Sequence, residues 1–394
     1  MLAAVTTLAA CSGNGSDDAA ESPGPTGPPA VPIGFINMEG SPAGSFPEAT
    51  AGAEAAVSYV NEELGGVGGR SVELSVCRTN GTPESSQSCA QRLVAARPVA
   101  VIGGVDLGAE TSVPIITAAG IPYVTGSPTL IGELRNDGAY AFTGGVAGDL
   151  LAIGQHLVEE RRVRSIHVLH ADLPGLLNSA VSAAGDVFRA RDIRDVKLVA
   201  ENVDAADFAP ALTAATAGDP DALVVVFPAQ SCSRIRQAAA SRGVRTQMYF
   251  PGACAAPAVV QGADAVLDRT TFASAYLPVP AEGGLAEEQA FRAGVGQDQR
   301  SPISQAAFSS VLNLHALLVR SGTDAAAVRA ALASAVDAPN AFAHPYTCDG
   351  QQIPLLPSVC NTSVRLLTYA DGAFTDVSGD WVDGSELSRV IGGG

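Results

Sequence analysis

The seven cysteines are the residues with the clearest chemistry in this 394-residue sequence. Six of them form three pairs of near neighbours along the chain: Cys77 with Cys89, Cys232 with Cys254, and Cys348 with Cys360. An even set of closely spaced cysteines is typical of disulfides formed in an oxidising compartment. The spacing therefore predicts three disulfides and a location outside the cytoplasm.

Cys11 stands apart from these six. It follows Leu8, Ala9 and Ala10, and an apolar residue and two small ones before a cysteine resemble the lipobox of bacterial lipoproteins. Residues 12–30 are rich in Ser, Gly, Pro, Ala and acidic residues, so we expect a disordered tether. Residues 1–11 would then be a signal-peptide remnant with its lipobox, and a lipid on Cys11 would anchor the chain to the cell membrane.

Composition and spacing also argue against several function classes. The net charge of −17 and the single lysine, Lys197, are unlike a surface that binds nucleic acid. Gly65–Gly69 follows an expected helix and precedes an expected strand, which is the reverse of a phosphate-binding loop. His167 and His170 are three residues apart on an expected strand, so they face opposite sides and cannot share a metal ion. We therefore expect neither an enzyme nor a bound cofactor or metal.

The helices and strands that must position these residues can be predicted from an alternating pattern in the sequence. Short apolar runs alternate with longer segments of helical period, which predicts an α/β fold with parallel sheets. The expected strands are 31–36, 72–76, 99–102, 121–124, 165–169, 222–227, 247–250 and 271–276. An apolar face from Ala53 to Leu64 predicts a crossover helix that stops at Gly65. Because 47% of the residues are hydrophobic and single cores stop growing near about 250–300 residues, we expect two lobes.

Two glycine- and proline-rich stretches, 143–148 and 277–284, interrupt this alternating pattern and are candidate hinges. They divide the chain into a first lobe of residues 31–145 and 278–340 and a second lobe of residues 146–277 and 341–394. Further helices are expected near 287–291 and 303–321, the latter with Leu312 and Val319 along one side. The tail predicts short strands at 364–369 and 373–377.

Four groups of motifs stand out between residue 31 and about residue 320: 52–57 with 60–61 and 65–69, 101–104, 120–124, and 243–247. Together they resemble the type I periplasmic binding proteins of the leucine/isoleucine/valine class, the solute receptors of ABC importers. The resemblance implies two doubly wound parallel-sheet α/β lobes, joined by three hinge strands, that close on a small solute. It also implies a monomer whose partners are that solute and an ABC permease.

The candidate binding residues lie in the loops that follow the expected strands. In open parallel sheets, ligands bind beyond the carboxyl ends of the strands, where loops and helix N-termini converge. The loops are 37–46, 103–110, 126–130, 170–175, 227–233 and 250–255, with Cys232 and Cys254 in the last two. Their candidate ligand-binding residues are Glu39, Ser41, Asp106, Leu107, Gly108, Ser127, Thr129, Asp172, Phe227 and Gln230.

The resemblance gives some of these residues roles. It implies that Asp106–Gly108 hold a solute carboxylate, that Ser127 and Thr129 hold the same end, and that other loops supply Phe227 to stack and Gln230 to hydrogen-bond. Alternatively, the aspartate only caps the next helix, the two hydroxyl residues only shape a turn, and the phenylalanine belongs to the core.

Two departures from the family pattern concern the solute. The family's acidic partner for an ammonium group belongs where Gly252 and Ala253 stand, and a common tyrosine is replaced within residues 173–175. Glu39 or Asp172 could supply the missing charge, and a solute other than an α-amino acid is equally open. We expect capture of a small polar solute (an amino acid, amide or related carboxylate) and its delivery to an ABC importer. The alternative is a sensor that passes its closure to a membrane signalling partner.

Overall fold

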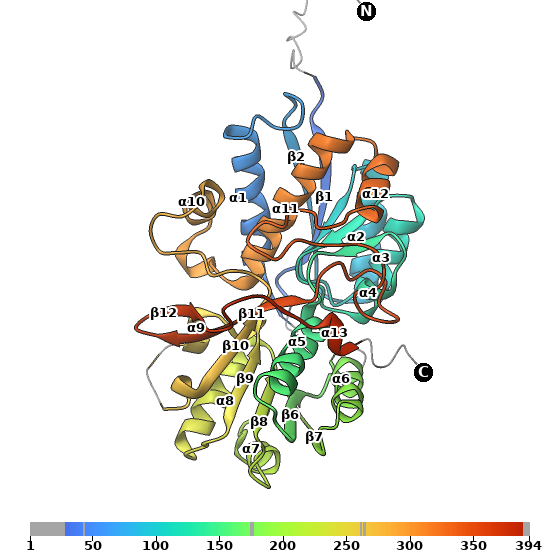
Figure 1. The fold of residues 1–394 in the computed structure, drawn as a ribbon. Coiled ribbons are helices and arrows are strands. Elements are labelled where there is room, and N and C mark those ends of the chain that lie inside the picture. The colour runs from blue at the N-terminus through green and yellow to red at the C-terminus, as the bar shows by residue number, and fades with distance from the viewer. Residues whose placement is uncertain (1–27, 42–43, 174–176, 261, 263–264, 389–394) are drawn as a thin grey trace, which may run out of the picture.

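The structure, a computed structural model, describes residues 28–41, 44–173, 177–260, 262 and 265–388. Cys11 and residues 12–27 of the expected tether lie outside the described residues. The chain forms two α/β lobes, one above the other in Figure 1, and it crosses between them near Thr143, Tyr276 and Asn361. The predicted two-lobed α/β architecture is confirmed.

The first lobe is built on a five-stranded parallel sheet in the order β2-β1-β3-β4-β5. Its strands are β1 (Val31–Met38), β2 (Val72–Thr79), β3 (Val101–Gly103), β4 (Tyr123–Thr125) and β5 (Ala139–Ala141). Successive residues of β1 enter different cores, Phe35 on one face and Ile36 on the other, because strand side chains alternate. One face packs against α1 (Pro47–Glu62), α11 (Pro302–Ser321) and α12 (Ala325–Ala333), and the other against α2 (Pro83–Ala96), α3 (Ala109–Ala118) and α4 (Ile131–Arg135).

Helix α11 passes through the core of this lobe. By length and apolar composition alone it could cross a membrane, but most of it is buried inside the fold, as in a core helix. The side buried carries Phe308, Val311 and Leu314, whereas Val319 is 58% exposed. Of the side expected to run through Leu312 and Val319, Leu312 packs against the core and Val319 does not.

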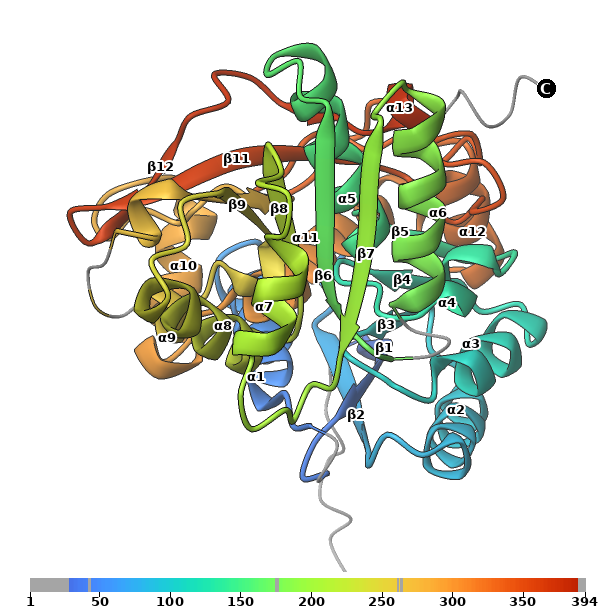
Figure 2. The ribbon, with the colours of Figure 1, turned by 90° about the horizontal axis from the view of Figure 1, so that it is seen from below.

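The second lobe contains a mixed eight-stranded sheet in the order β12-β11-β10-β9-β8-β6-β7, with β13 paired to β11. Its strands are β6 (Ser165–Ala171), β7 (Asp195–Glu201), β8 (Ala222–Val226), β9 (Gln247–Pro251), β10 (Thr270–Ser274), β11 (Ser363–Ala370), β12 (Ala373–Asp376) and β13 (Val382–Asp383). Figure 2 shows α5 (Gly145–Glu159) and α6 (Asn178–Ala190) on one side of the sheet and α7 (Ala209–Ala215), α8 (Ala229–Ser241) and α9 (Pro257–Val260) on the other. Strand β11 runs antiparallel to β10 and β12 antiparallel to β11, so this sheet is mixed at one edge.

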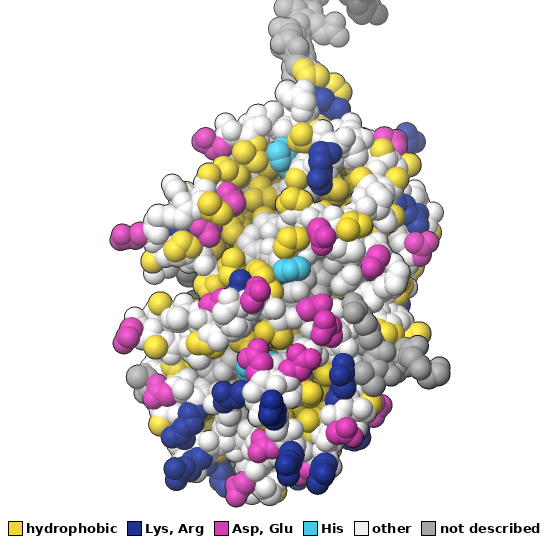
Figure 3. Space-filling model, viewed as in Figure 1, with side chains coloured by type: hydrophobic (Ala, Val, Ile, Leu, Met, Phe, Trp, Pro, Cys, Tyr) yellow, Lys and Arg dark blue, Asp and Glu magenta, His cyan; other side chains and the backbone are white. Residues whose placement is uncertain are grey.

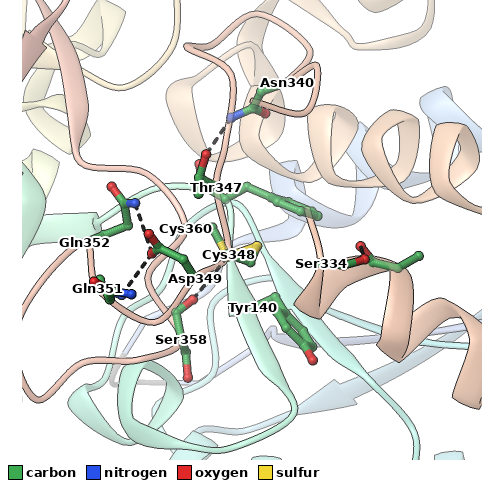
Figure 4. Close-up of a disulfide and its surroundings, with 12 residues drawn as sticks. Tyr140, Ser334, Asn340, Thr347, Cys348, Asp349, Gln351, Gln352, Ser358 and Cys360 are labelled. Carbon is green, nitrogen blue, oxygen red and sulfur yellow. Dashed lines mark hydrogen bonds between the residues drawn. A yellow bond between two sulfur atoms is a disulfide. The ribbon is translucent and has the colours of Figure 1, made fainter. Parts of the chain in front are cut away.

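The three predicted cysteine pairs are disulfide-bonded in the structure. Cys348–Cys360 lies beside Tyr140 and Ser358 (Figure 4). The backbone N–H of Cys360 donates to the carbonyl of Ala141 at 2.9 Å, which ties this loop to β5. Cys348 and Cys360 thus join the core of the first lobe, although residues 341–394 were assigned to the second. Between the two cysteines, Ile353, Leu356 and Val359 pack into the core of the second lobe, so this loop contacts both lobes before β11 begins.

Candidate functional site

A cavity of about 90 Å³ lies between the two lobes. The first lobe contributes the loop after β4 and the start of α11, and the second contributes the start of α5, the turn after β9 and the end of β10. The lining residues are Gly126, Ser127, Pro128, Thr143, Gly145, Val146, Asp149, Gly252, Ala253, Ser274, Ala275, Tyr276, Pro302, Ile303 and Ala306. This is the carboxyl end of β4, β9 and β10, where the parallel strands predict a ligand site.

The loop after β4 is held in place from both sides of the cavity. The Tyr276 hydroxyl donates to the carbonyl oxygen of Gly126 at 2.8 Å, and the Thr143 hydroxyl donates to the same oxygen at 3.0 Å. A Cβ on Gly126 would lie 2.4 Å from the Tyr276 hydroxyl, so only glycine fits at this approach. Two segments that cross between the lobes therefore fix one wall of the cavity.

Buried Glu133 fixes the other end of this loop. One carboxylate oxygen accepts hydrogen bonds from the backbone N–H groups of Thr129 and Leu130 at 2.7 and 2.8 Å, and the other accepts from the Tyr123 hydroxyl at 2.8 Å. Burial raises the pKa of Glu133 to about 7, because the loss of hydration outweighs these hydrogen bonds. The loop that carries Ser127 and Thr129 is thus anchored by groups behind the cavity wall.

Asp149 faces the cavity from the second turn of α5. Its side chain is 8% exposed, and Oδ2 accepts a hydrogen bond from the backbone N–H of Gly252 at 3.1 Å. Burial raises the pKa of Asp149 to about 7, although the Gly252 hydrogen bond opposes the shift. Sequence reasoning missed this residue. The signal was present, because Asp149 is the only acidic residue between Gly145 and Val158 in an otherwise apolar helix.

A second cavity, of about 200 Å³, adjoins the first and shares Ser274, Tyr276 and Pro302 with it. Its other walls include the apolar side chains of Phe291 from α10 (Ala286–Gly294), Leu367 from β11 and Phe374 from β12. The region between the lobes therefore has a polar part beside Asp149 and a more apolar part beside these rings.

Of the ten predicted contact residues, Ser127 lines the first cavity, within the part of the chain that the structure describes. Thr129 lies two residues further along the same anchored loop, and its hydroxyl donates to the Ser127 carbonyl at 3.4 Å. The loop before α3 differs from the alternative interpretation, because the N-cap of α3 is Gly108 and no side chain caps this helix. Asp106 is fully buried, and its carboxylate accepts hydrogen bonds from the hydroxyls of Ser86 and Ser112 at 2.6 and 2.8 Å.

The remaining residues of that loop serve the same local structure. The backbone N–H of Gly108 donates to the Asp106 carboxylate at 3.1 Å, and a Cβ on this glycine would lie 2.1 Å from the Ser86 hydroxyl. Leu107 is partly exposed beside it, and neither residue lines the two cavities. Ser41 pairs with Gly44 in an isolated bridge and is also outside the lining.

The two acids proposed to replace the missing charge are occupied elsewhere. Glu39 forms an ion pair with Arg78 at 2.8 Å and accepts a hydrogen bond from Thr50 at 2.5 Å. Burial raises the pKa of Glu39, but hydrogen bonds from Thr50 and Arg78 and the charge of Arg78 bring it below its usual value. Asp172 is exposed after β6 and accepts a hydrogen bond from Asn178 at 2.8 Å. Neither lines the cavities between the lobes.

Two predicted contacts belong to α8 and the strand before it. Phe227 is a core residue of the second lobe, where its ring meets that of Phe208 edge to face at 5.6 Å, so the alternative interpretation holds. Gln230 is exposed in the first turn of α8. Cys232–Cys254 joins this turn to the turn after β9 and so braces the Gly252 side of the cavity.

Charge is unevenly distributed around this site. Figure 3 shows basic side chains (Lys and Arg) gathered at the lower end of the second lobe and several acidic side chains nearer the waist between the lobes. The first cavity contains few charged groups, because Asp149 is the one charged side chain among its described lining residues.

Comparisons with known proteins give a consistent picture of the fold. A sequence profile of the periplasmic binding protein family matches residues 30–353. LivJ from Streptococcus pneumoniae, a branched-chain amino acid transporter substrate binding protein solved with isoleucine, is 19% identical with a TM-score of 0.69, and the match covers 88% of this chain and 97% of LivJ. A comparison with curated protein sequences gave no match.

Two further solved structures carry other names. A fatty acid ABC transporter substrate-binding protein from Thermomonospora curvata is 14% identical with a TM-score of 0.72, covering 91% of this chain and 94% of its own. A solute binding protein of an ABC transporter from R. palustris, solved with 4-hydroxybenzoate, is 17% identical with a TM-score of 0.68, covering 88% of this chain and 95% of its own. These neighbours share the fold while differing in solute.

Proposed function

Because this chain belongs to the periplasmic binding protein family, we propose that it captures a small polar solute between its lobes and delivers it to an ABC importer. The observation that carries the proposal is the cavity lined by residues of both lobes beside the segments that cross between them. A solute bound there contacts both lobes at once, so it stabilises the closed arrangement by its difference in affinity for the open and closed forms.

The polar groups on the cavity wall support a solute with several hydrogen-bonding atoms. Ser127, Thr143 and Ser274 carry hydroxyls there, and Gly145 and Val146 begin α5, whose first N–H groups have no partner within the helix. We propose that Ser127 and the start of α5 bind one end of the solute, with Thr129 supporting the loop.

The proposed location is the outer face of the cell membrane. Proteins of this family are extracytoplasmic, and three disulfides fit an oxidising compartment. We further propose that Cys11 carries a lipid anchor and that the protein acts as a monomer. Mass spectrometry of the protein from a bacterial membrane fraction tests the anchor, since a diacylglycerol on an N-terminal Cys11 gives a defined mass increase.

A thermal-shift screen of amino acids, amides, short peptides and carboxylates tests the solute-binding function. A solute present at about 100 times its dissociation constant adds roughly 2.7 kcal/mol to the free energy of unfolding, which raises Tm measurably. A Ser127→Tyr variant places a large ring in the cavity and serves as the control that should lose the shift. The proposal fails if no small solute raises the Tm of the wild-type protein.

A further inference from the structure

The carboxyl of Asp149 is a buried polar group without a full set of partners. Its Oδ2 accepts one hydrogen bond, from the backbone N–H of Gly252 at 3.1 Å. Within the residues that the structure describes, Oδ1 has no hydrogen bond and the carboxyl has no ion pair, and Oδ1 is not among the fully enclosed polar atoms that lack a partner. A buried carboxyl in this condition is costly, because buried charges in proteins are normally paired and hydrogen-bonded. The unused oxygen belongs to a side chain that lines the cavity, where a ligand can reach it.

The groups around Asp149 supply no counter-charge. Gly252 and Ala253 approach from the turn after β9, Ser274 and Ala275 from the end of β10, and the lobe opposite contributes Gly126–Pro128, Ile303 and Ala306. Tyr276 is the one other titratable side chain among the described lining residues, its hydroxyl donates to Gly126, and burial raises the pKa of its phenol. The cavity is therefore locally negative whenever Asp149 is ionised.

The position of Asp149 also bears on the acid missing from the turn after β9. A Cβ on Gly252 would lie 2.9 Å from the Ala273 carbonyl oxygen, so this position has no room for a side chain without a backbone shift. Asp149 reaches the same turn from α5 and bonds to its backbone. A carboxyl is thus present beside the turn, but a different element supplies it.

We propose that Asp149 binds a cationic nitrogen of the solute, so that the solutes of this protein carry an ammonium, amidinium or guanidinium group. The inference rests on the proposed solute-binding function and narrows its substrate class. A cationic N–H donor would complete the hydrogen bonding of Oδ1 and neutralise the carboxylate in a site shielded from water, where charge-assisted hydrogen bonds are strong.

The adjoining cavity extends the description of the solute. Phe291, Leu367 and Phe374 line it, and it meets the Asp149 cavity at Ser274 and Tyr276. Arg292 and Arg300 also line it, and their side chains donate to backbone carbonyls, Arg292 to Pro280 and Arg300 to Val295. A solute with its cationic nitrogen at Asp149 would therefore place an apolar part toward these rings.

Paired probes that differ in the ammonium group test the proposal. The pairs are L-leucine with 4-methylpentanoate and 3-methylbutylamine with 3-methylbutanol, and calorimetry gives Kd for the wild type, Asp149→Asn and Glu159→Gln. The asparagine can still accept the Gly252 hydrogen bond, and exposed Glu159 on the same helix is the matched charge-removal control. We expect an ammonium probe to bind the wild type and Glu159→Gln alike, its partner to bind weakly, and Asp149→Asn to lose at least about 10-fold in affinity.

The pH dependence gives a second readout that needs no variant. Because the pKa of Asp149 is raised to about 7, the affinity for the ammonium probe should rise about 100-fold between about pH 5 and pH 8, and this rise should be absent in Asp149→Asn.

Two results would overturn the inference. If both members of a pair bind equally, or if Asp149→Asn binds the ammonium probe like the wild type, Asp149 does not select a cation, although solute binding itself stands. If neither ammonium probe binds while the broad screen yields only uncharged or anionic solutes, the cationic class is wrong and the proposed function survives. If the broad screen also yields nothing, the proposed function fails as well.

Discussion

At the residue scale, the Asp106 carboxylate holds three elements of the first lobe together. It accepts hydrogen bonds from Thr79 at the end of β2, Ser86 of α2 and Ser112 of α3, at 3.2, 2.6 and 2.8 Å. We predict that Asp106→Ala lowers the free energy of unfolding by about 3 kcal/mol or more, because it leaves buried donors without an acceptor. Urea unfolding measures the effect, and Asp106→Asn, which keeps one acceptor oxygen, should lose less. A loss below about 1 kcal/mol for the alanine variant would contradict this role.

Asp149 should make stability depend on pH. Its folded-state pKa of about 7 lies above the ordinary aspartate value of 3.8, so protonation favours the folded state. The stabilisation is full below the unfolded-state pKa and is lost as pH rises through about 7, an effect of order 4 kcal/mol. Glu133 acts in the same direction, since burial also raises its pKa to about 7.

We therefore predict that the wild type has a lower free energy of unfolding at about pH 8 than at about pH 5, as measured by urea unfolding. The Asp149→Asn variant should reduce this difference in free energy by a few kcal/mol. The Glu159→Gln control should behave like the wild type. An unchanged pH difference in Asp149→Asn would show that the carboxyl is ionised without cost in the folded protein.

The candidate site was only partly predictable from residue types. The sequence placed Ser127 in the correct loop because that loop follows a parallel strand, and strand order alone fixes where such loops converge. The sequence did not distinguish Asp106, whose carboxylate accepts hydrogen bonds from buried hydroxyls, from Asp149, which lines the cavity. That distinction depends on the direction of each side chain in the packed fold, and a pattern along the chain does not contain it.

At the element scale, the start of α5 combines a strained backbone with close contact between the lobes. Gly145 has φ of 53°, and a Cβ there would lie 2.7 Å from the Pro128 carbonyl oxygen. We predict that Gly145→Ala lowers the free energy of unfolding by about 1 kcal/mol or more and weakens solute binding, since the left-handed conformation and the contact both disfavour a side chain.

Gly148, one turn further along α5, is the matched control for this prediction. A Cβ there would have its nearest contact at 3.7 Å, with the Cα of Thr362, which is ordinary van der Waals distance. Gly148→Ala should therefore be neutral or stabilise the helix by up to about 1 kcal/mol. Thermal unfolding of both variants checks the pair, and equal destabilisation would mean that position 145 has no special role.

Some strands were easier to predict from the sequence than others. Every expected strand is present with shifted ends, because buried parallel strands form continuous apolar runs. Three strands were missed, one of which is the two-residue β13. Strand β5 has three residues, which is too short for a periodic signal, and β7 at the sheet edge carries Asp195, Lys197 and Glu201, which resemble a solvent-exposed segment.

At the scale of the whole molecule, two lobes could be predicted because the chain is longer than one hydrophobic core usually allows. The boundary between the lobes could not be predicted in this way. The expected boundary at the proline- and glycine-rich stretch 277–284 stays a prediction, and the segment that leads into β11 follows Cys360. Just before Cys360, Val359 forms an isolated bridge with Ala141 of β5, and a single contact between distant segments leaves no compositional trace.

The most direct test of the account is the distance between the lobes as solute is added. Fluorescent labels on Glu62→Cys in α1 and Gln237→Cys in α8, both exposed positions, report this distance by energy transfer. We predict a saturable change in transfer at the same concentrations that raise Tm, and its loss in the Ser127→Tyr variant. A solute that raises Tm while energy transfer stays constant would contradict capture between closing lobes.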